Sequence, residues 1–195
     1  MKKYSVIYAD PPWQTKAGRD LGKYKVEDGK QVFNVKNNKS RELPYKSMSV
    51  EEICNLPINK IAEENCHLYM WVTNQYLLKA QQVITAWGFK YSTTLVWAKK
   101  PLGGGLGGNY KISTEFLLFC TKGKLKAKER HTGTWFEVKR TYVGGYPCHS
   151  KKPEFFRQLI EKVSPGPYVE LFARHETLGW DVFGNEVENS IQLSK

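Results

Sequence analysis

The sequence predicts an α/β fold in which a mostly parallel sheet is flanked by helices on both faces. Short apolar runs of the kind that form buried strands alternate along the chain with stretches of helical spacing, which is the pattern of parallel sheets. The chain has 195 residues, of which 41% are hydrophobic and 25% charged, and these values fit one folded domain. We therefore predict a single domain over residues 1–195.

The N-terminal part of the chain is predicted to contain one strand, one long loop and one short helix. Tyr4–Ala9 is an apolar, β-rich run that stops abruptly at two consecutive prolines, as a buried strand does where it ends in a functional loop. Residues 14–46 are polar and without period, which predicts a loop. Ser49 with Glu52 three residues later fits a capping box and predicts a helix to about Asn55.

The middle of the chain is predicted to form a strand, a helix and two more strands. His67–Thr73 is a buried-type strand, and apolar spacing predicts a helix over Gln75–Trp87. Strands are expected at Tyr91–Ala98 and Glu115–Thr121. We interpret the glycine-rich segment 103–108 between them as a surface loop, with a flap over the site as the alternative. One face of the helix would be made of Leu77, Leu78, Val83, Ile84 and Trp87.

The C-terminal part is predicted to place a second polar strand end beside the first. We expect a helix over Pro153–Val163, a buried strand over Tyr168–Ala173 and a weaker strand or turn over Trp180–Val187. Ligands of parallel sheets bind beyond the carboxyl ends of the strands. The polar residues that begin at Asp10 and at Arg174 are therefore expected to be neighbours at a site.

The charge of the chain indicates a polyanionic partner. The formal net charge is +11, from 30 Lys and Arg against 19 Asp and Glu, and the excess is concentrated in segments 14–46 and 122–147. Both segments carry aromatic residues among the lysines, which suits phosphate pairing and base stacking. We treat both as candidate nucleic-acid-binding loops, with solvated loops as the alternative.

Neither a metal site nor a membrane segment is predicted. The four cysteines lack Cys-x-x-Cys spacing, and scattered ligands such as Cys120, His131, Cys148 and His149 rarely form a zinc site. The first apolar stretch has about six residues, too few for a signal-peptide core or a membrane span. We expect a cytoplasmic protein.

Eight segments of the chain resemble, in order and spacing, the DPPW-type N6-adenine methyltransferases. This is the family of the catalytic subunit of the eukaryotic messenger-RNA adenosine methyltransferase and of its bacterial and phage relatives, and the resemblance covers nearly the whole chain. The segments are YADPPW (8–13), LPYKSMSVEEICNLP (43–57), LYMWVTN (68–74), LVWAKK (95–100), EFLLFCTKG (115–123), HSKKPE (149–154), ELFARHE (170–176) and GWDVFGNE (179–186).

The resemblance implies an S-adenosylmethionine-dependent enzyme that methylates N6 of adenine and releases S-adenosylhomocysteine. It implies a Rossmann-like fold in permuted order, with the catalytic strand Tyr4–Ala9 first and the cofactor strand Tyr168–Ala173 near the C-terminus. The small size favours the bacterial or phage branch, which modifies DNA. An RNA adenosine methyltransferase and a noncatalytic nucleic-acid-binding subunit stay open as alternatives, and the protein could be a monomer or a homodimer.

The resemblance also assigns cofactor residues. It implies that Lys152 pairs with the methionine carboxylate of the cofactor and that Asp10 faces the sulfonium. A lysine ammonium can form an ion pair with the cofactor carboxylate, and the side chains of an Asn-Glu pair can hydrogen-bond to the vicinal hydroxyls of a ribose. The remaining positions implied are Glu170, Phe172 packing nearby, and Arg174, Asn185 and Glu186 at the ribose.

The chemistry of Asp10-Pro11-Pro12-Trp13 agrees with the resemblance. The adenine amine is a poor nucleophile because its lone pair is delocalised, so a catalyst must hold its two hydrogens. The Asp10 carboxylate and the Pro11 carbonyl can each accept one, and the consecutive prolines, Pro11 and Pro12, restrict the backbone that presents them. Trp13 would stack on the base, and Tyr45 matches a family position on a loop that closes over it. For Trp13 a buried ring in a proline-rich turn is the alternative, and for Tyr45 a buried loop anchor.

Overall fold

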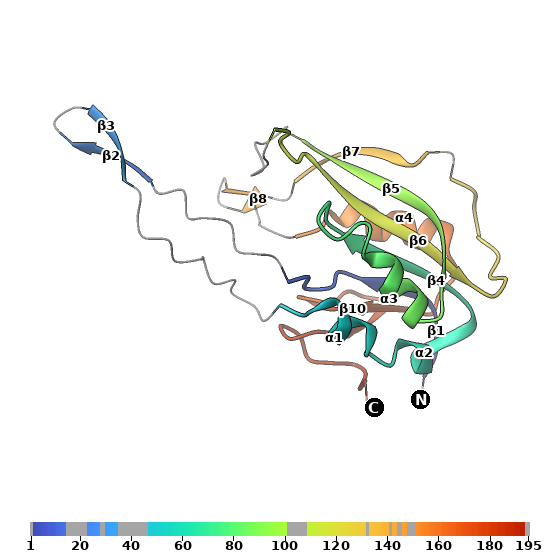
Figure 1. Cartoon of the computed structure of the whole chain (residues 1–195). Helices are drawn as coiled ribbons and strands as arrows, with labels where there is room; N and C mark the ends of the chain where they lie inside the picture. The colour runs from blue at the N-terminus through green and yellow to red at the C-terminus, as the bar shows by residue number, and fades with distance from the viewer. Residues whose placement is uncertain are drawn as a thin grey trace.

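A seven-stranded sheet forms the centre of the structure, in the order β11-β10-β1-β4-β6-β5-β7 (Figure 1). The computed structural model describes residues 2–14, 23–27, 30–34, 47–100, 109–131, 133–140, 142–143, 146–147 and 151–193. The strands of this sheet are β1 (Tyr4–Ala9), β4 (Ala62–Val72), β5 (Lys90–Lys100), β6 (Thr114–Lys122), β7 (Trp135–Lys139), β10 (Tyr168–Leu171) and β11 (Trp180–Phe183).

The sheet is mostly parallel, as predicted. β11, β10, β1 and β4 pair in parallel with one another, and β7 is parallel to β5. β6 is antiparallel to both of its neighbours, β4 and β5. No helix lies between β5 and β6 among the described residues, and antiparallel strands need no crossover helix. The fold is a Rossmann-like arrangement with one antiparallel strand inside it.

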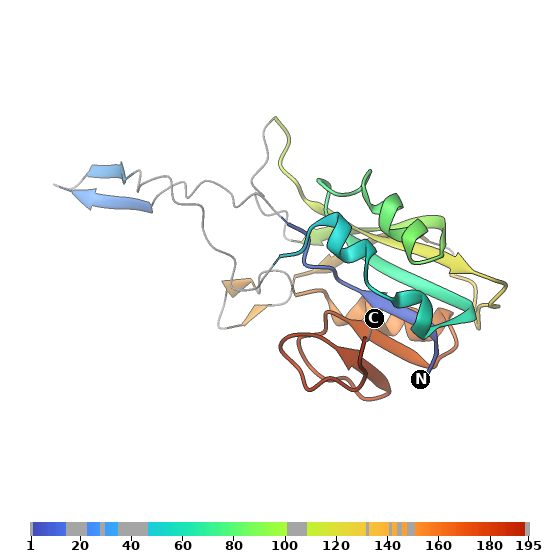
Figure 2. The same cartoon turned by 60° about the horizontal axis from the view of Figure 1, so that its bottom comes forward.

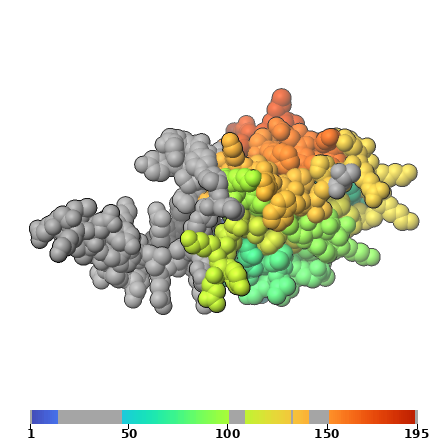
Figure 3. Space-filling view, turned by 90° about the horizontal axis from the view of Figure 1, so that it is seen from above, coloured from blue at the N-terminus to red at the C-terminus, as the bar shows by residue number. Residues whose placement is uncertain are grey.

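Helices cover both faces of the sheet, and side chains alternate between the two cores. On β1, Tyr4, Ile7 and Ala9 belong to one core, while Val6 and Tyr8 belong to the other. The first core is completed by α1 (Val50–Cys54), α2 (Ile58–Ile61) and α3 (Ala80–Ala86), and the second by α4 (Glu154–Val163). Figure 2 shows α3 (green) and α4 (orange) on opposite sides of the strands, and in the space-filling view of Figure 3 the green atoms lie mainly at the bottom and the orange atoms mainly at the top.

The predicted capping box is confirmed at the start of α1. The Glu52 amide donates to the Ser49 hydroxyl oxygen at 3.1 Å, and the Ser49 amide donates to a Glu52 carboxylate oxygen at 2.7 Å. Two amide groups that lack partners inside the helix are thereby satisfied. This local pattern starts the helix at the residue that the sequence indicated.

The predicted helix over Gln75–Trp87 is shorter in the structure, and its predicted inward face is confirmed at Val83, Ile84 and Trp87 but not at Leu78. α3 begins at Ala80, because the preceding residues form separate turns closed by hydrogen bonds such as Tyr76 N–H to the Thr73 carbonyl. Tyr76 is buried, whereas Leu78 is 93% exposed, so the expectation that Leu78 packs against the core is wrong.

A hairpin occupies part of the segment that was predicted to be a loop. β2 (Lys23–Glu27) and β3 (Lys30–Asn34) pair antiparallel, with Glu27 opposite Lys30. The Asp-Gly pair at positions 28–29 is a typical hairpin sequence, and it is the signal that could have predicted this element. The chain also contains a two-stranded pair of β8 (Tyr142–Val143) and β9 (Tyr146–Pro147).

Two further expectations concern metals and membranes. Among the described residues, no group of three or more His, Cys, Asp and Glu side chains is placed to hold a metal ion. Cys120 is buried in β6, whereas Cys148 and His149 lie outside the described residues, as does the glycine-rich segment 103–108. In the described part of the chain, no helix has the length and apolar character needed to cross a bilayer.

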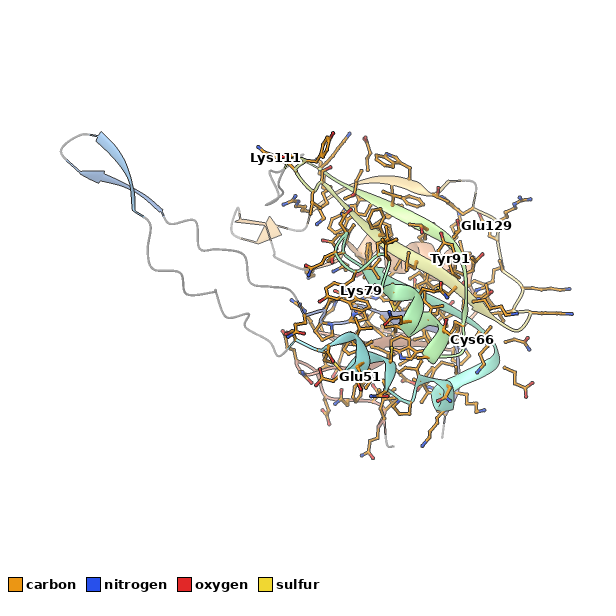
Figure 4. The ribbon with its side chains drawn as sticks, viewed as in Figure 1. Glu51, Cys66, Lys79, Tyr91, Lys111 and Glu129 are labelled. Atoms are coloured by element: carbon orange, nitrogen blue, oxygen red, sulfur yellow. The ribbon has the colours of Figure 1, made fainter. Side chains whose placement is uncertain are left out.

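A buried histidine ties three elements together at the end of the sheet where β4 begins. His67 Nε2 lies 3.2 Å from the Leu125 carbonyl oxygen, which can only accept, so Nε2 carries the hydrogen. His67 Nδ1 therefore accepts from the Ser164 hydroxyl at 2.7 Å, and the Tyr69 hydroxyl donates to Ser164 Oγ at 2.8 Å. Figure 4 labels the adjacent Cys66 at this end and Lys111 near the other end.

Acid is expected to destabilise the fold through His67. Burial holds the pKa of His67 below its ordinary value of 6.5. Between the two pKa values, His67 is therefore protonated in the unfolded chain but neutral in the folded protein. The stability is complete above pH 6.5 and is lost as the pH falls from there through the lower folded-state pKa, by up to about 1.4 kcal/mol per unit of pKa shift.

Urea denaturation at about pH 7.5 and about pH 5.5 checks this expectation. His67→Gln should show a smaller loss of stability between the two pH values than the wild type. His131→Gln, at an exposed position, serves as the matched control and should keep the wild-type loss. Equal losses in the wild type and in His67→Gln would contradict the assignment.

Candidate active site

The carboxyl ends of β1 and β10 lie side by side and form the floor of the candidate site. Ala9 pairs with Leu171, and the Asp10 N–H donates to the Leu171 carbonyl oxygen at 3.4 Å. Asp10 and Phe172 are the first residues beyond the two strands. The expectation that these polar strand ends are neighbours is confirmed.

Two adjoining pockets open at this edge of the sheet. The charged pocket has a volume of about 380 Å³ and lies between Asp10, the start of α4 and the end of β10. The larger pocket, of about 580 Å³, extends from Asp10 along the proline turn to residues 183–186. Asp10, Lys152, Phe172 and Arg174 line both pockets. A ligand could therefore span the two, with Asp10 at its middle.

The structure brings together all the predicted site residues that it describes. Tyr45 lies outside the described residues. Glu170 lines the charged pocket. The other predicted residues all line the larger pocket: Asp10, Pro11, Pro12, Trp13, Lys152, Phe172, Arg174, Asn185 and Glu186.

Four charged side chains of alternating sign connect the floor of the site. Lys152 Nζ lies 2.8 Å from Asp10 Oδ2 and 3.4 Å from Glu115 Oε2. Glu115 in turn pairs with Lys99. The side chains of Lys152, Glu115 and Lys99 are 13%, 16% and 17% exposed, and that of Asp10 is 25% exposed. Each of these ions has lost much of its hydration, so it depends on the neighbouring ion of opposite charge for stabilisation. This dependence favours fixed positions for the four side chains.

Burial and pairing shift the ionisation of this network. Burial raises the pKa of Asp10, and the Lys152 ammonium opposes that shift. Burial would also raise the pKa of Glu115, but Lys152 and Lys99 outweigh it and hold the pKa below its usual value. Burial would lower the pKa of Lys152, yet the two carboxylates outweigh it and the pKa is raised. Lys152 is therefore firmly cationic.

The proline turn after β1 is held from several sides. The Trp13 N–H donates to the Pro11 carbonyl oxygen and the Met48 N–H to the Pro12 carbonyl oxygen, both at 2.8 Å. The Trp13 indole donates to the Trp71 carbonyl oxygen at 2.9 Å and stacks on the Tyr76 ring, with centroids 5.0 Å apart. Trp13 is only 5% exposed. Its ring is therefore largely covered in this conformation, which fits a buried ring in a proline-rich turn better than a ring that stacks on a base.

Two backbone features shape the opposite wall of the larger pocket. Phe172 has φ 63°, a left-handed conformation that costs a non-glycine residue roughly 1 kcal/mol, and strain of this kind is typical of functional sites. Gly184 lies so close to Ala173 that an added Cβ would be 2.0 Å from the Ala173 carbonyl oxygen. Only glycine permits this approach, which brings Asn185 and Glu186 beside Arg174.

Gly184→Ala is expected to destabilise the protein by roughly 2 kcal/mol, because the two backbone segments that follow β10 and β11 must separate to admit the methyl group. The free energy of unfolding in urea measures this effect. Gly133→Ala is the matched control: its nearest described neighbour would be 4.0 Å away, and its stability should stay within about 0.5 kcal/mol of the wild type. Equal stabilities of the two variants would contradict the close approach.

Sequence reasoning missed several residues of the site. Lys99 and Glu115 line the larger pocket, and Arg157 lines the charged pocket. Lys99 and Glu115 fall inside the segments LVWAKK and EFLLFCTKG, which carried the family resemblance. Their meeting with Lys152 depends on the antiparallel direction of β6, which places the start of that strand at the site edge.

The second basic segment, 122–147, divides between the two ends of the sheet. Lys122 pairs with Cys66 in the ladder of β6 and β4, at the end far from Asp10. The Lys124 N–H donates to Asn65 Oδ1 at the same end. Lys139 instead pairs with Lys100 at the edge where the site lies. Among its described residues, the segment therefore reaches the edge that carries the pockets at the end of β7, and the side chains of 15–46 lie outside the described residues.

Comparison with known proteins gives one family over nearly the whole chain. The model of the MT-A70 family matches residues 4–186. The chain is 31% identical to the type II methyltransferase M.MunI of Mycoplasma sp, over 98% of this chain and 82% of that protein. It is 28% identical to human N(6)-adenine-specific methyltransferase METTL4 and 24% identical to N6-methyladenosine RNA methyltransferase MTA1 of Cryphonectria parasitica. These matches cover 95% and 94% of this chain, but only 38% and 52% of the relatives.

Proposed function

The chain belongs to the MT-A70 family, whose methyltransferases use S-adenosylmethionine, and on this premise we propose that it transfers the methyl group of that cofactor to N6 of adenine in DNA. The observation that carries the proposal is the position of Asp10. Its carboxylate lies where the two pockets meet and is paired with Lys152 at 2.8 Å. One pocket would hold the amino-acid part of the cofactor, and the other its nucleoside and the target base.

The charged pocket suits the methionine part of the cofactor. Lys151, Lys152 and Arg174 supply positive charge for a carboxylate, while Asp10 and Glu170 supply negative charge for an ammonium. The carboxylate and the ammonium of the methionine part would each face side chains of the opposite charge in this pocket. The sulfonium would then lie near Asp10, where both pockets begin.

The larger pocket suits a nucleoside. Arg174, Asn185 and Glu186 are exposed along its far wall, with Arg174 Nε 3.8 Å from Glu186 Oε1. Amide and carboxylate oxygens accept hydrogen bonds from vicinal hydroxyls, so this wall would hold the ribose. Phe172 would pack against the cofactor between the two pockets.

The target amine would be held at Asp10 and the proline turn. The Asp10 carboxylate would accept one hydrogen of the amine, and the Pro11 carbonyl, which has a second lone pair besides that used by Trp13, would accept the other. Lys152 would orient the Asp10 carboxylate through its hydrogen bond. Trp13 would stabilise the proline turn through its indole hydrogen bond to Trp71 and would not stack on the base. The cofactor, when bound, would supply the methyl group: the amine nitrogen would bond to the methyl carbon while the carbon–sulfur bond broke to give S-adenosylhomocysteine, and the extra proton would pass to solvent. Positioning supplies most of the acceleration.

DNA is the substrate that we favour. The match to a type II methyltransferase extends over most of both chains, and the net charge of +11 suits a polyanion. RNA is the second candidate, because a relative of similar coverage of this chain is named an RNA methyltransferase.

Transfer of tritiated methyl groups from S-adenosylmethionine to genomic DNA and to total RNA tests the proposal. We expect label in DNA, recovered after digestion as N6-methyldeoxyadenosine. Label in RNA alone would establish the second candidate. Cofactor binding without any transfer would instead indicate a noncatalytic subunit and would contradict the proposed activity.

A further inference from the structure

Arg157 is a buried cation beside the charged pocket. It projects from α4, and its side chain is only 6% exposed. Its Nη2 donates to Glu170 Oε2 at 2.6 Å, and its Nη1 contacts the Glu154 carboxylate. Its guanidinium carbon lies 5.9 Å from the centre of the Trp180 ring. Each of the two hydrogen bonds thus ends on a carboxylate that lines the charged pocket.

Burial of the Arg157 charge is not explained by a gain in folding stability. Burying a guanidinium costs several kcal/mol of hydration, and well-packed apolar residues are often at least as stabilising as a buried ion pair. The Nε atom of Arg157 is buried and has no hydrogen-bond partner among the described residues. The rest of α4 packs Phe156, Leu159 and Ile160 against the sheet, so an apolar residue would be the ordinary choice here.

The Glu170 carboxylate, which Arg157 contacts, lines the charged pocket. It lies on β10 opposite Tyr8 of β1, and its side chain is 12% exposed. Burial raises the pKa of Glu170, and Arg157 opposes that shift. Without the guanidinium, the carboxylate would lose both its counter-ion and its orienting hydrogen bond.

We propose that Arg157 is a positioning residue of the cofactor site, which holds the Glu170 carboxylate as an oriented anion at the charged pocket so that it can accept a hydrogen bond from the ammonium group of the bound cofactor. The inference rests on the proposed function, because it requires S-adenosylmethionine in that pocket. Arg157 itself acts through Glu170.

Calorimetry with two ligands tests the inference. Arg157→Gln should weaken binding of S-adenosylmethionine by about tenfold or more, the usual worth of a hydrogen bond to a charged group. Binding of 5′-methylthioadenosine should change less than about twofold, because this ligand lacks the amino-acid part that Glu170 contacts. A general loss of structure would weaken both ligands alike.

Two further variants complete the design. Glu170→Gln should reproduce the loss of Arg157→Gln, and the double variant should be no weaker than either single one, since both remove the same contact. Lys162→Gln is the matched control, because Lys162 is an exposed cation on the same helix, paired with Glu129, and its removal should leave both affinities unchanged. If Arg157→Gln does not fold, Arg157→Lys replaces it, because lysine keeps the positive charge but not the guanidinium. A loss of affinity for S-adenosylmethionine but not for 5′-methylthioadenosine would then support the positioning role of Arg157.

The outcomes separate the two levels of the proposal. Failure of the wild-type protein to bind S-adenosylmethionine overturns the proposed function, and the role of Arg157 with it. A wild type that binds, with an Arg157→Gln variant of equal affinity or of equal loss for both ligands, overturns the role of Arg157 alone. Additive losses in the double variant would show that Arg157 does not act through Glu170.

Discussion

Asp10→Asn is expected to reduce methyl transfer by about 10³-fold, while S-adenosylmethionine binding remains measurable by calorimetry. The amide keeps the size of the side chain but removes its negative charge and places an NH₂ group against Lys152, which lies 2.8 Å from Asp10 Oδ2. The target amine would lose its strongest acceptor at the moment when positive charge develops on its nitrogen. Single-turnover transfer of labelled methyl to DNA measures the effect.

Asp181→Asn is the matched control for that experiment. Asp181 is a carboxylate on β11 that also accepts hydrogen bonds, in its case from Lys2 and Tyr4, and it lines neither pocket. Its substitution should leave transfer unchanged. If Asp10→Asn retained transfer within a few-fold of the control, Asp10 would not be the acceptor.

Lys152→Met is expected to lower the free energy of unfolding by about 3 kcal/mol and to abolish transfer. The ammonium contacts Asp10 and Glu115, and without it two poorly solvated carboxylates lose the cation that they share, which leaves Lys99 beside Glu115 and the more distant charge of Arg174 on Asp10. Methionine fills the space of the aliphatic chain, so the loss reports on the charge. Urea denaturation measures the stability.

Lys151→Met provides the comparison for Lys152. Lys151 is the preceding residue and is exposed, so its substitution should change the stability by less than about 0.5 kcal/mol. Equal stabilities of the two variants would show that the ion network at the floor of the site does not contribute to folding.

Local patterns in the sequence predicted the parts of the fold that local interactions determine. The apolar run Tyr4–Ala9 is β1 with the same bounds, and the Ser49 capping box starts α1 where expected. Parallel strands share one carboxyl edge, so the ends of β1 and β10 could also be predicted to meet. The family resemblance then supplied residues such as Lys152 that no local pattern singles out.

The features that the sequence did not predict depend on tertiary packing. The network from Lys99 to Asp10 requires β6 to run antiparallel, and strand direction is not encoded in the apolar run itself. Trp13 was expected to face a base, but the hydrogen bond of its indole to Trp71 and the ring of Tyr76 draw it into the core. Leu78 has the spacing of a core residue, yet the turns before α3 leave it exposed.

We propose that one cleft, with Asp10 at its middle, brings the cofactor to the amine of adenine. Mass spectrometry of nucleosides from cells that express the wild type or Asp10→Asn tests this proposal. We expect N6-methyldeoxyadenosine to rise in the DNA of wild-type cells only. Methylated adenine at equal levels in both cell lines, or its absence from DNA and RNA alike, would contradict the claim.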